Sequence, residues 1–254
     1  MDGYSRVFDT AIKEYNKVID KESLYTSFRK QYNIYGFIDN GDYPPDMEAD
    51  KIAREINIKM YFEYKASLRY RKECGYGNSK PIYGDYNNLD SRHIMMFVII
   101  FSNIKEDIKS DVEIGGGFGN WLTLNQHIPN WSIIDLPHVL GLQKWWLTQQ
   151  DIDSSRYTFI SAFDYDNWAK QHLSHDLVIG SHSLSEVSLD IFESYFHKVI
   201  SKSKYFFYAY HNTRPTPQLI AAKLSIIQTR FNLIINVQSE NKNVSNCVFV
   251  CKNV

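Results

Sequence analysis

The chain contains the segment Val112-Glu113-Ile114-Gly115-Gly116-Gly117-Phe118-Gly119, and this segment indicates its fold class. The first three residues are typical of a short buried strand, and the glycines that follow are typical of a tight turn. A helix is expected from about residue 120. A strand, a glycine-rich turn and a helix in this order open a nucleoside-binding α/β unit, because glycine lets the backbone come close to a ligand.

A second acidic residue, Asp135, ends the next apolar segment, Trp131-Ser132-Ile133-Ile134-Asp135. A carboxylate at the end of the second strand can accept hydrogen bonds from both hydroxyls of a ribose. The two segments together therefore predict a nucleoside pocket at the carboxyl ends of the first two strands. A glycine-rich turn that binds no ligand is the structural alternative.

The spacing of the glycines distinguishes two kinds of nucleoside cofactor. A dinucleotide fingerprint has the pattern Gly-x-Gly-x-x-Gly and places a pyrophosphate at a helix N-terminus. Here the glycines occupy positions 115, 116, 117 and 119. The last glycine of the fingerprint would fall at position 120, so Gly119 comes one residue early. Glu113 precedes the first glycine by two positions. The pattern Glu-x-Gly-x-Gly-x-Gly resembles motif I of the class I S-adenosylmethionine-dependent methyltransferases, whose cofactor carries an ammonium and a sulfonium.

From about residue 111 onward, strand-like and helical segments alternate. Strands are expected at about 111–115, 131–135, 157–161, 176–181 and 205–211. Two further strand-like segments, 231–238 and 244–251, flank a polar segment and predict an antiparallel hairpin. Five βα units and a terminal hairpin predict the Rossmann-like, seven-stranded, mostly parallel α/β sheet of methyltransferases. A plain dinucleotide fold would carry six parallel strands.

The first 110 residues have a different pattern. Helical periodicity with mixed charge covers about 4–20, 22–35 and 46–73, and a further helix is expected at 89–103. We therefore divide the chain into a helical N-terminal extension, residues 1–110, and a methyltransferase core, residues 111–254. The extension is expected to cap the sheet edge and to shape the acceptor site.

Composition and charge limit the classes of function. The net charge of −1 argues against a nucleic-acid acceptor. The longest apolar run, Ile94 to Phe101, is too short to span a bilayer. The three cysteines are few and odd in number, and the charged N-terminus does not resemble a signal peptide. We therefore expect reduced thiols and a cytoplasmic protein (the host cytoplasm if the source is viral).

Three motifs together resemble a narrower family. They are Glu113 to Gly119, Ile133-Ile134-Asp135-Leu136-Pro137 and Ser181-His182-Ser183-Leu184-Ser185-Glu186. In order and spacing they are similar to the sugar O-methyltransferases of bacterial and viral surface-glycan pathways, and the resemblance covers about residues 83–251. It implies transfer of a methyl group from S-adenosylmethionine to a sugar hydroxyl of a glycan or glycoconjugate, with a deoxyhexose as one acceptor to test.

The resemblance also implies which residues contact the cofactor. All of them lie at or after the ends of the first four expected strands: Glu113, Gly115, Gly117, Asp135, Leu136, Ala162, Phe163, Asp164 and Ser181. Asp135 would hold the ribose hydroxyls, Leu136 would pack on the adenine, and Ser181 would lie beside the sulfonium. By position alone, Arg92 is a candidate for the methionine carboxylate.

A sugar hydroxyl is a poor nucleophile, so methyl transfer needs a base beside it. His182 lies at the carboxyl end of the fourth strand, where ligands of open α/β sheets bind, and is the predicted base. Glu186 is predicted to orient its imidazole or to contact the sugar, and His211 is the second candidate base. Purely structural roles stay open for all three residues. Asp164 and Asp166 offer a divalent-metal alternative, which is not favoured because no compact carboxylate cluster surrounds them.

Other classes of function compete with methyl transfer. An NAD-dependent oxidoreductase is disfavoured by the early third glycine and by the terminal hairpin. A non-catalytic, methyltransferase-like scaffold is disfavoured because Glu113, Asp135 and the glycines are all present.

Overall fold

The computed structural model describes residues 3–28, 31–35, 44–68, 87–210, 216–238 and 246–252. The chain divides into two compact units, each built from several segments. The first, here called the helical unit, comprises 1–98, 117–126 and 137–155, and the second, the sheet unit, comprises 99–116, 127–136 and 156–254. The domain boundary expected at residue 110 stays a prediction.

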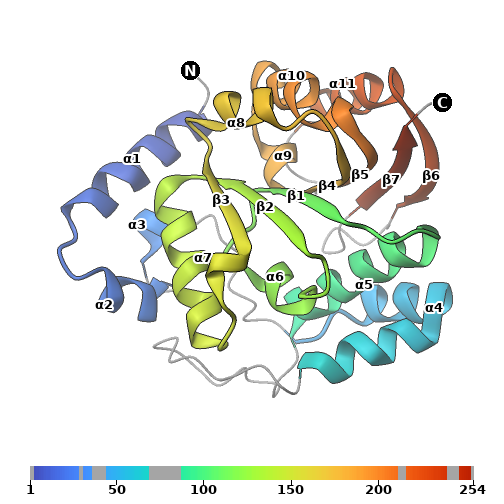
Figure 1. Ribbon diagram of the computed structural model, residues 1–254, viewed down its shortest axis with the longest axis horizontal. Coiled ribbons are helices and arrows are strands. Elements are labelled where there is room, and N and C mark those ends of the chain that lie inside the picture. The colour runs from blue at the N-terminus through green and yellow to red at the C-terminus, as the bar shows by residue number, and fades with distance from the viewer. Residues whose placement is uncertain are drawn as a thin grey trace. The chain divides into compact units, whose positions relative to one another are not determined.

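In the described residues, the sheet unit forms a seven-stranded sheet in the order β3-β2-β1-β4-β5-β7-β6 (Figure 1). The strands are β1 Ser110–Ile114, β2 Asn130–Asp135, β3 Tyr157–Ser161, β4 His175–Ser181, β5 Ser203–Tyr210, β6 Phe231–Val237 and β7 Asn246–Lys252. Strands β1 to β5 are parallel, and β7 runs antiparallel to both β5 and β6. The predicted fold class is therefore confirmed, while the turn of the hairpin lies outside the described residues.

Helices of the sheet unit pack on one face of this sheet (Figure 1). They are α8 Tyr165–Gln171, α9 Ser183–Glu186, α10 Leu189–Lys198 and α11 Pro217–Gln228, with the short 3₁₀ helix η4 Ile200–Lys202. On β1, Val112 and Ile114 belong to the buried cluster beneath these helices. Because successive strand side chains alternate between faces, Asp111 and Glu113 point to the opposite face.

The order of the strands locates the ligand-binding edge. The chain runs outward from β1 through β2 to β3 and then returns to place β4 on the other side of β1. Open α/β sheets bind ligands at the carboxyl ends of the strands where the order reverses in this way. A ligand is therefore expected to bind at the segments that follow β1, β2 and β4.

The helical unit holds most of the remaining helices, together with the larger part of the 3₁₀ helix η3 Ser154–Arg156. They are α1 Gly3–Lys17, α2 Lys21–Thr26, α3 Tyr32–Tyr35, α4 Met47–Ser67, α6 Asn120–Leu124, α7 Pro137–Gln149 and the larger part of α5 Asn88–Asn103. The long apolar run of α5, Ile94 to Ile100, is completely buried, as expected of a helix that is apolar on all sides. No helix in the described part of the chain is both long and apolar enough to cross a membrane.

The N-terminal helices differ from the sequence prediction. The single helix expected over 22–35 is replaced by α2, which ends at Thr26, and the separate α3. Helix α4 is interrupted at Asn57, whose φ of −156° and ψ of 93° are not helical. Asn57 Oδ1 accepts a hydrogen bond from Met60 N at 3.1 Å, so its side chain caps the second half of the helix. The part expected beyond Leu68 lies outside the described residues.

Two tyrosines join the first helices to α7. Tyr15 Oη and Tyr25 Oη lie 2.8 Å apart, and a Cβ atom at Gly141 would overlap with Tyr25 Oη. Glycine inside a helix costs about 1 kcal/mol relative to alanine. At position 141 the missing side chain makes room for the tyrosine pair, which explains a glycine in the middle of α7.

We expect Gly141→Ala to destabilise the protein by about 1–3 kcal/mol, because the overpacking against Tyr25 outweighs the gain in helix propensity. Urea unfolding of Gly141→Ala in the wild-type and Tyr25→Phe backgrounds measures this effect. The loss should shrink in the Tyr25→Phe background, which lacks the overlapping oxygen. An equal loss in both backgrounds would contradict the packing argument.

Candidate functional site

The turn after β1 depends on glycine at several positions. Gly115, Gly117 and Gly119 have φ values of 78°, 57° and 98°, which residues with a Cβ atom rarely adopt. A Cβ atom at Gly115 would also overlap with the side chain of Ser183, while one at Gly117 would meet no atom within 4 Å. Glycine at 115 therefore allows the turn to approach the segment after β4, a constraint that the motif does not reveal.

Asp135 is fixed at the end of β2 by backbone donors. Its Oδ2 accepts a hydrogen bond from Gly116 N at 2.9 Å, and its Oδ1 accepts one from Leu136 N at 2.7 Å. The side chain is buried, and both bonds are charge-assisted. Each carboxylate oxygen has a second lone pair, so the group can still accept hydrogen bonds from a ligand.

Glu113 lies on the same face of the sheet as Asp135, because Glu113 is paired with Ile133 and side chains alternate along β2. It is 1% exposed. Burial and the charge of Asp135 raise the pKa of Glu113 to about 8, against an opposing effect of Trp131. Within the described residues, Glu113 Oε2 has no hydrogen-bond partner. A buried acceptor of this kind suits a ligand that brings a donor or a positive charge.

The segment after β3 lies beside Asp135. Ala162 N donates to Asp135 O at 2.8 Å, and the next residue, Phe163, is 67% exposed. An accessible aromatic ring at a strand end can stack on a flat ligand. Asp164 is the exposed N-cap residue of α8. Both carboxylate oxygens of Asp166 accept hydrogen bonds from Lys198 Nζ at 2.7 Å.

The segment after β4 forms the short helix α9, which the sequence did not predict. His182 precedes it with a φ of 65° and ψ of −46°, an uncommon conformation for a residue with a side chain. Its N donates to Ala209 O at 3.0 Å, and its O accepts from Ser185 N at 2.8 Å. Ser183 Oγ donates to Ile114 O and so joins α9 to the end of β1. Backbone strain of this kind clusters at functional sites.

A buried lysine holds the other end of α9. Lys223 Nζ donates to the carbonyl oxygens of Leu184, Ser185 and Val187 at 2.9, 2.9 and 2.6 Å. Burial lowers the pKa of Lys223 to about 8, while the charge of Glu186 opposes this change. Burial raises the pKa of Glu186 to about 7, against the charge of Lys223. The electrostatic environment of Glu186 therefore includes Lys223, which stands on α11.

The sequence patterns did not identify Lys223 as a residue of the site. The signal for it is a lysine at helical spacing between Ile220 and Ile227, on the stripe of α11 that becomes buried. A lysine inside an apolar stripe is rarely buried without partners, and its partners are known only after folding.

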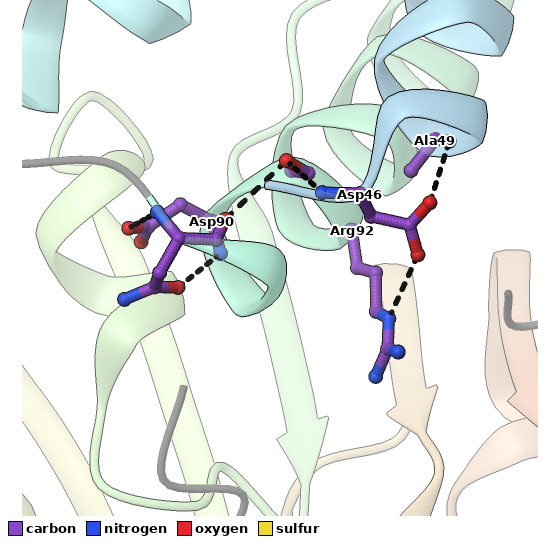
Figure 2. A network of polar contacts seen from close by, with 6 residues as sticks. Asp46, Ala49, Asp90 and Arg92 are labelled. Carbon is purple, nitrogen blue, oxygen red and sulfur yellow. Dashed lines mark hydrogen bonds and ion pairs between the residues drawn. The ribbon is translucent and has the colours of Figure 1, made fainter. Parts of the chain in front are cut away.

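The structure places most of the predicted site residues at one edge of the sheet unit. They follow the carboxyl ends of β1 to β4: Gly115, Leu136, Ala162, Phe163, Asp164, His182 and Glu186, with Glu113, Asp135 and Ser181 inside the strand ends. Gly117 belongs to the helical unit, and His211 lies outside the described residues. In the helical unit, Arg92 Nε pairs with Asp46 Oδ2 at 3.3 Å (Figure 2).

No metal-binding arrangement of three or more His, Cys, Asp or Glu side chains occurs among the described residues.

Comparisons with known proteins identify the fold. No protein-family model matches the chain, and no curated protein matches it. Magnesium protoporphyrin IX methyltransferase from Synechocystis PCC 6803 with bound SAM is similar with a TM-score of 0.52 and 13% identity, over 94% of this chain and 100% of that chain. A mutant of MtNAS in complex with S-adenosylmethionine gives a TM-score of 0.50 and 14% identity, over 98% and 89%.

The PH0226 protein from Pyrococcus horikoshii OT3 has a TM-score of 0.51 and 11% identity, over 65% of this chain and 92% of that chain. At such identities the likeness concerns the fold alone. The chain has the Rossmann-like fold of the class I S-adenosylmethionine-dependent methyltransferases.

We expect Gly115→Ala to lower the free energy of unfolding more than Gly117→Ala does. Both variants place a Cβ atom at positive φ, which costs about 1–2 kcal/mol, but only Gly115→Ala also overlaps with Ser183. Urea unfolding measures both losses. Adding Ser183→Gly to Gly115→Ala should recover part of the loss, and a double variant with no recovery would contradict the close approach.

The raised pKa of Glu186 predicts a pH-dependent effect of Glu186→Gln. The folded state holds the proton up to about pH 7, whereas the unfolded state releases it near the ordinary pKa of 4.5. The stability that protonation contributes is therefore present below the unfolded pKa and is lost as the pH rises to the folded pKa. The variant should gain stability relative to wild type from pH 5 to pH 7, as measured by urea unfolding at each pH. A difference that is independent of pH would refute the assignment.

Proposed function

We propose that this protein is an S-adenosylmethionine-dependent O-methyltransferase that acts on a sugar hydroxyl of a glycan or glycoconjugate. The observation that carries the proposal is the carboxylate of Asp135, which Gly116 N and Leu136 N hold at the carboxyl ends of β1 and β2. In a sheet with the methyltransferase fold, a fixed carboxylate at this place suits a ribose diol.

The residues present fit the proposed cofactor. Glu113 supplies a buried oxygen that lacks a donor within the described residues, which suits the positively charged part of the molecule. Phe163, next to Ala162, offers an accessible ring for the adenine. Leu136 and Ser181 would complete the walls of this pocket, and Gly117 would let the backbone approach it. When bound, S-adenosylmethionine supplies an activated methyl group on a good leaving group.

His182 is the proposed base. An imidazole accepts a proton near neutral pH, as removal of the hydroxyl proton requires. Its backbone is held between Ala209 and Ser185, and the adjacent Ser183 is joined to the end of β1. These bonds would keep the imidazole at the end of β4 rather than on a mobile loop. Glu186 would orient the imidazole or contact the sugar hydroxyls, and His211 remains the second candidate base.

The choice of a sugar acceptor rests on the sequence motifs around Asp135 and His182. The net charge of −1 weighs against a nucleic-acid acceptor. The helical N-terminal extension, residues 1–110, would shape the acceptor site. Free thiols at Cys247 and Cys251 suit the proposed location in the cytoplasm.

Cofactor binding should depend on Asp135. We expect isothermal titration to show binding of S-adenosylhomocysteine to wild type, and about tenfold to hundredfold weaker binding to Asp135→Asn, because hydrogen bonds to a charged group are lost. Asp153→Asn is the matched control, since Asp153 Oδ1 also accepts a backbone hydrogen bond, from Ser155 N at 2.9 Å. Equal affinity of the two variants, or binding of NAD in place of S-adenosylhomocysteine, would overturn the cofactor assignment.

Turnover should depend on His182. His182→Ala is expected to lower methyl transfer by about 10²–10⁴-fold, the usual contribution of a positioned base, with little change in S-adenosylhomocysteine affinity. The assay uses labelled S-adenosylmethionine and a panel of deoxyhexose glycosides, with products read by mass spectrometry. Near-native turnover of the variant would remove His182 from this role. An absence of transfer to every sugar, with cofactor binding intact, would refute the acceptor class.

A further inference from the structure

A buried carboxylate begins the polar network at the start of α5. Asp90 N donates to Asn87 Oδ1 at 3.0 Å, and Asp90 Oδ2 accepts from Asn87 N at 3.2 Å. This reciprocal pair is a capping box, which satisfies donors at the first turn of α5. Asp90 is completely buried, so its remaining oxygen also needs a donor.

That donor comes from a distant part of the chain. Asn120 Nδ2 lies 3.3 Å from Asp90 Oδ1 and 2.9 Å from His93 Nδ1. Because the carboxylate can only accept, one amide hydrogen is directed to Asp90, which leaves the second for His93. His93 Nδ1 is then an acceptor, and the imidazole is neutral with its proton on Nε2. Asn120 is 1% exposed, so both of its amide hydrogens are used inside the protein.

Asn120 is also the first residue after the glycine-rich turn. It directly follows Gly119, which is the N-cap of α6 and has a φ of 98°. A glycine has no side chain with which to cap the helix or to fix the turn. Two residues before Gly119, the turn is held by a side chain of α7, because the buried Gln143 donates from Nε2 to Gly117 O at 3.0 Å.

We propose that Asn120 is a positioning residue for the cofactor. Through Asp90 and His93 it holds the end of the glycine-rich turn in the conformation that binds S-adenosylmethionine, so this inference rests on the proposed function. Glycines lose much conformational freedom when they are ordered, and a turn ordered before binding loses less of it on binding. Loss of Asn120 should therefore weaken cofactor binding without removing any group that touches the cofactor.

The same network contains a matched control. Ser91 Oγ donates to Asn87 O at 3.3 Å and accepts from Asp46 N at 3.0 Å. These bonds join α5 to the start of α4, in the part of the network that Figure 2 shows between Asp90 and Asp46. Ser91 is completely buried, as Asp90 is, but its bonds lead away from the glycine-rich turn.

The experiment compares wild type, Asn120→Ala and Ser91→Ala by thermal unfolding and by titration with S-adenosylhomocysteine. Both variants should unfold at lower temperature. Asn120→Ala should bind about tenfold more weakly or worse, whereas Ser91→Ala should bind within about twofold of wild type. With saturating S-adenosylmethionine, Asn120→Ala should keep its kcat within about threefold and show the loss in KM.

If Asn120→Ala does not fold, His93→Phe tests the same bond. It keeps an aromatic ring beside Trp121, whose centroid lies 5.6 Å from that of His93, and removes the Nδ1 acceptor. A smaller loss of affinity than for Asn120→Ala is expected. Two outcomes would overturn the inference. One is wild-type affinity in Asn120→Ala, or in His93→Phe if that variant has to replace it. The other is a loss of affinity in Ser91→Ala equal to that in Asn120→Ala. Failure of wild type to bind S-adenosylhomocysteine would instead refute the proposed function.

Discussion

The chain that leaves β1 has to pass Ser183 at a place where there is no room for a Cβ atom. Gly115 meets this constraint, with a φ of 78° that also favours glycine. The contact fixes the turn after β1 against the segment after β4, and Ser183 Oγ reinforces it by donating to Ile114 O. Asp135 then joins the same turn from β2 through Gly116 N. In this way three strand ends of the sheet unit are held together by glycine geometry and backbone hydrogen bonds, and the proposed cofactor and base positions depend on that arrangement.

Several buried ionisable groups of the sheet unit are unfavourable for its stability. Burial and nearby carboxylates raise the pKa values of Asp111 and Glu113 on β1. Burial also raises the pKa of Glu186 and lowers that of Lys223, although each lessens the change in the other. Burying an ionisable group is unfavourable unless partners compensate, and such groups concentrate at functional sites. The perturbed carboxyls Glu113 and Glu186 belong to β1 and α9, near the strand ends at which we propose that the cofactor and the base lie.

Much of the fold could be predicted from the sequence because its signals are local. Strand β3, Tyr157–Ser161, was predicted at the residues where it occurs, and helix α5, Asn88–Asn103, was predicted at 89–103, since apolar periodicity and turn residues define their ends. The interruption of α4 at Asn57 and the short helix α9 were not predicted. Asn57 competes with the helix through its side chain, and α9 is held by Lys223, whose partners are about forty positions away in the chain. The glycine motif and Asp135 could be found by spacing, whereas the contacts of Asn120 with Asp90 and His93 arise only from tertiary packing.

A crystal structure with bound S-adenosylhomocysteine tests the central claim most directly. We predict that both ribose hydroxyls donate to the carboxylate of Asp135, while Gly116 N and Leu136 N keep their bonds to it. Electron density for the ligand at another place, or a ribose that does not contact Asp135, would contradict the account.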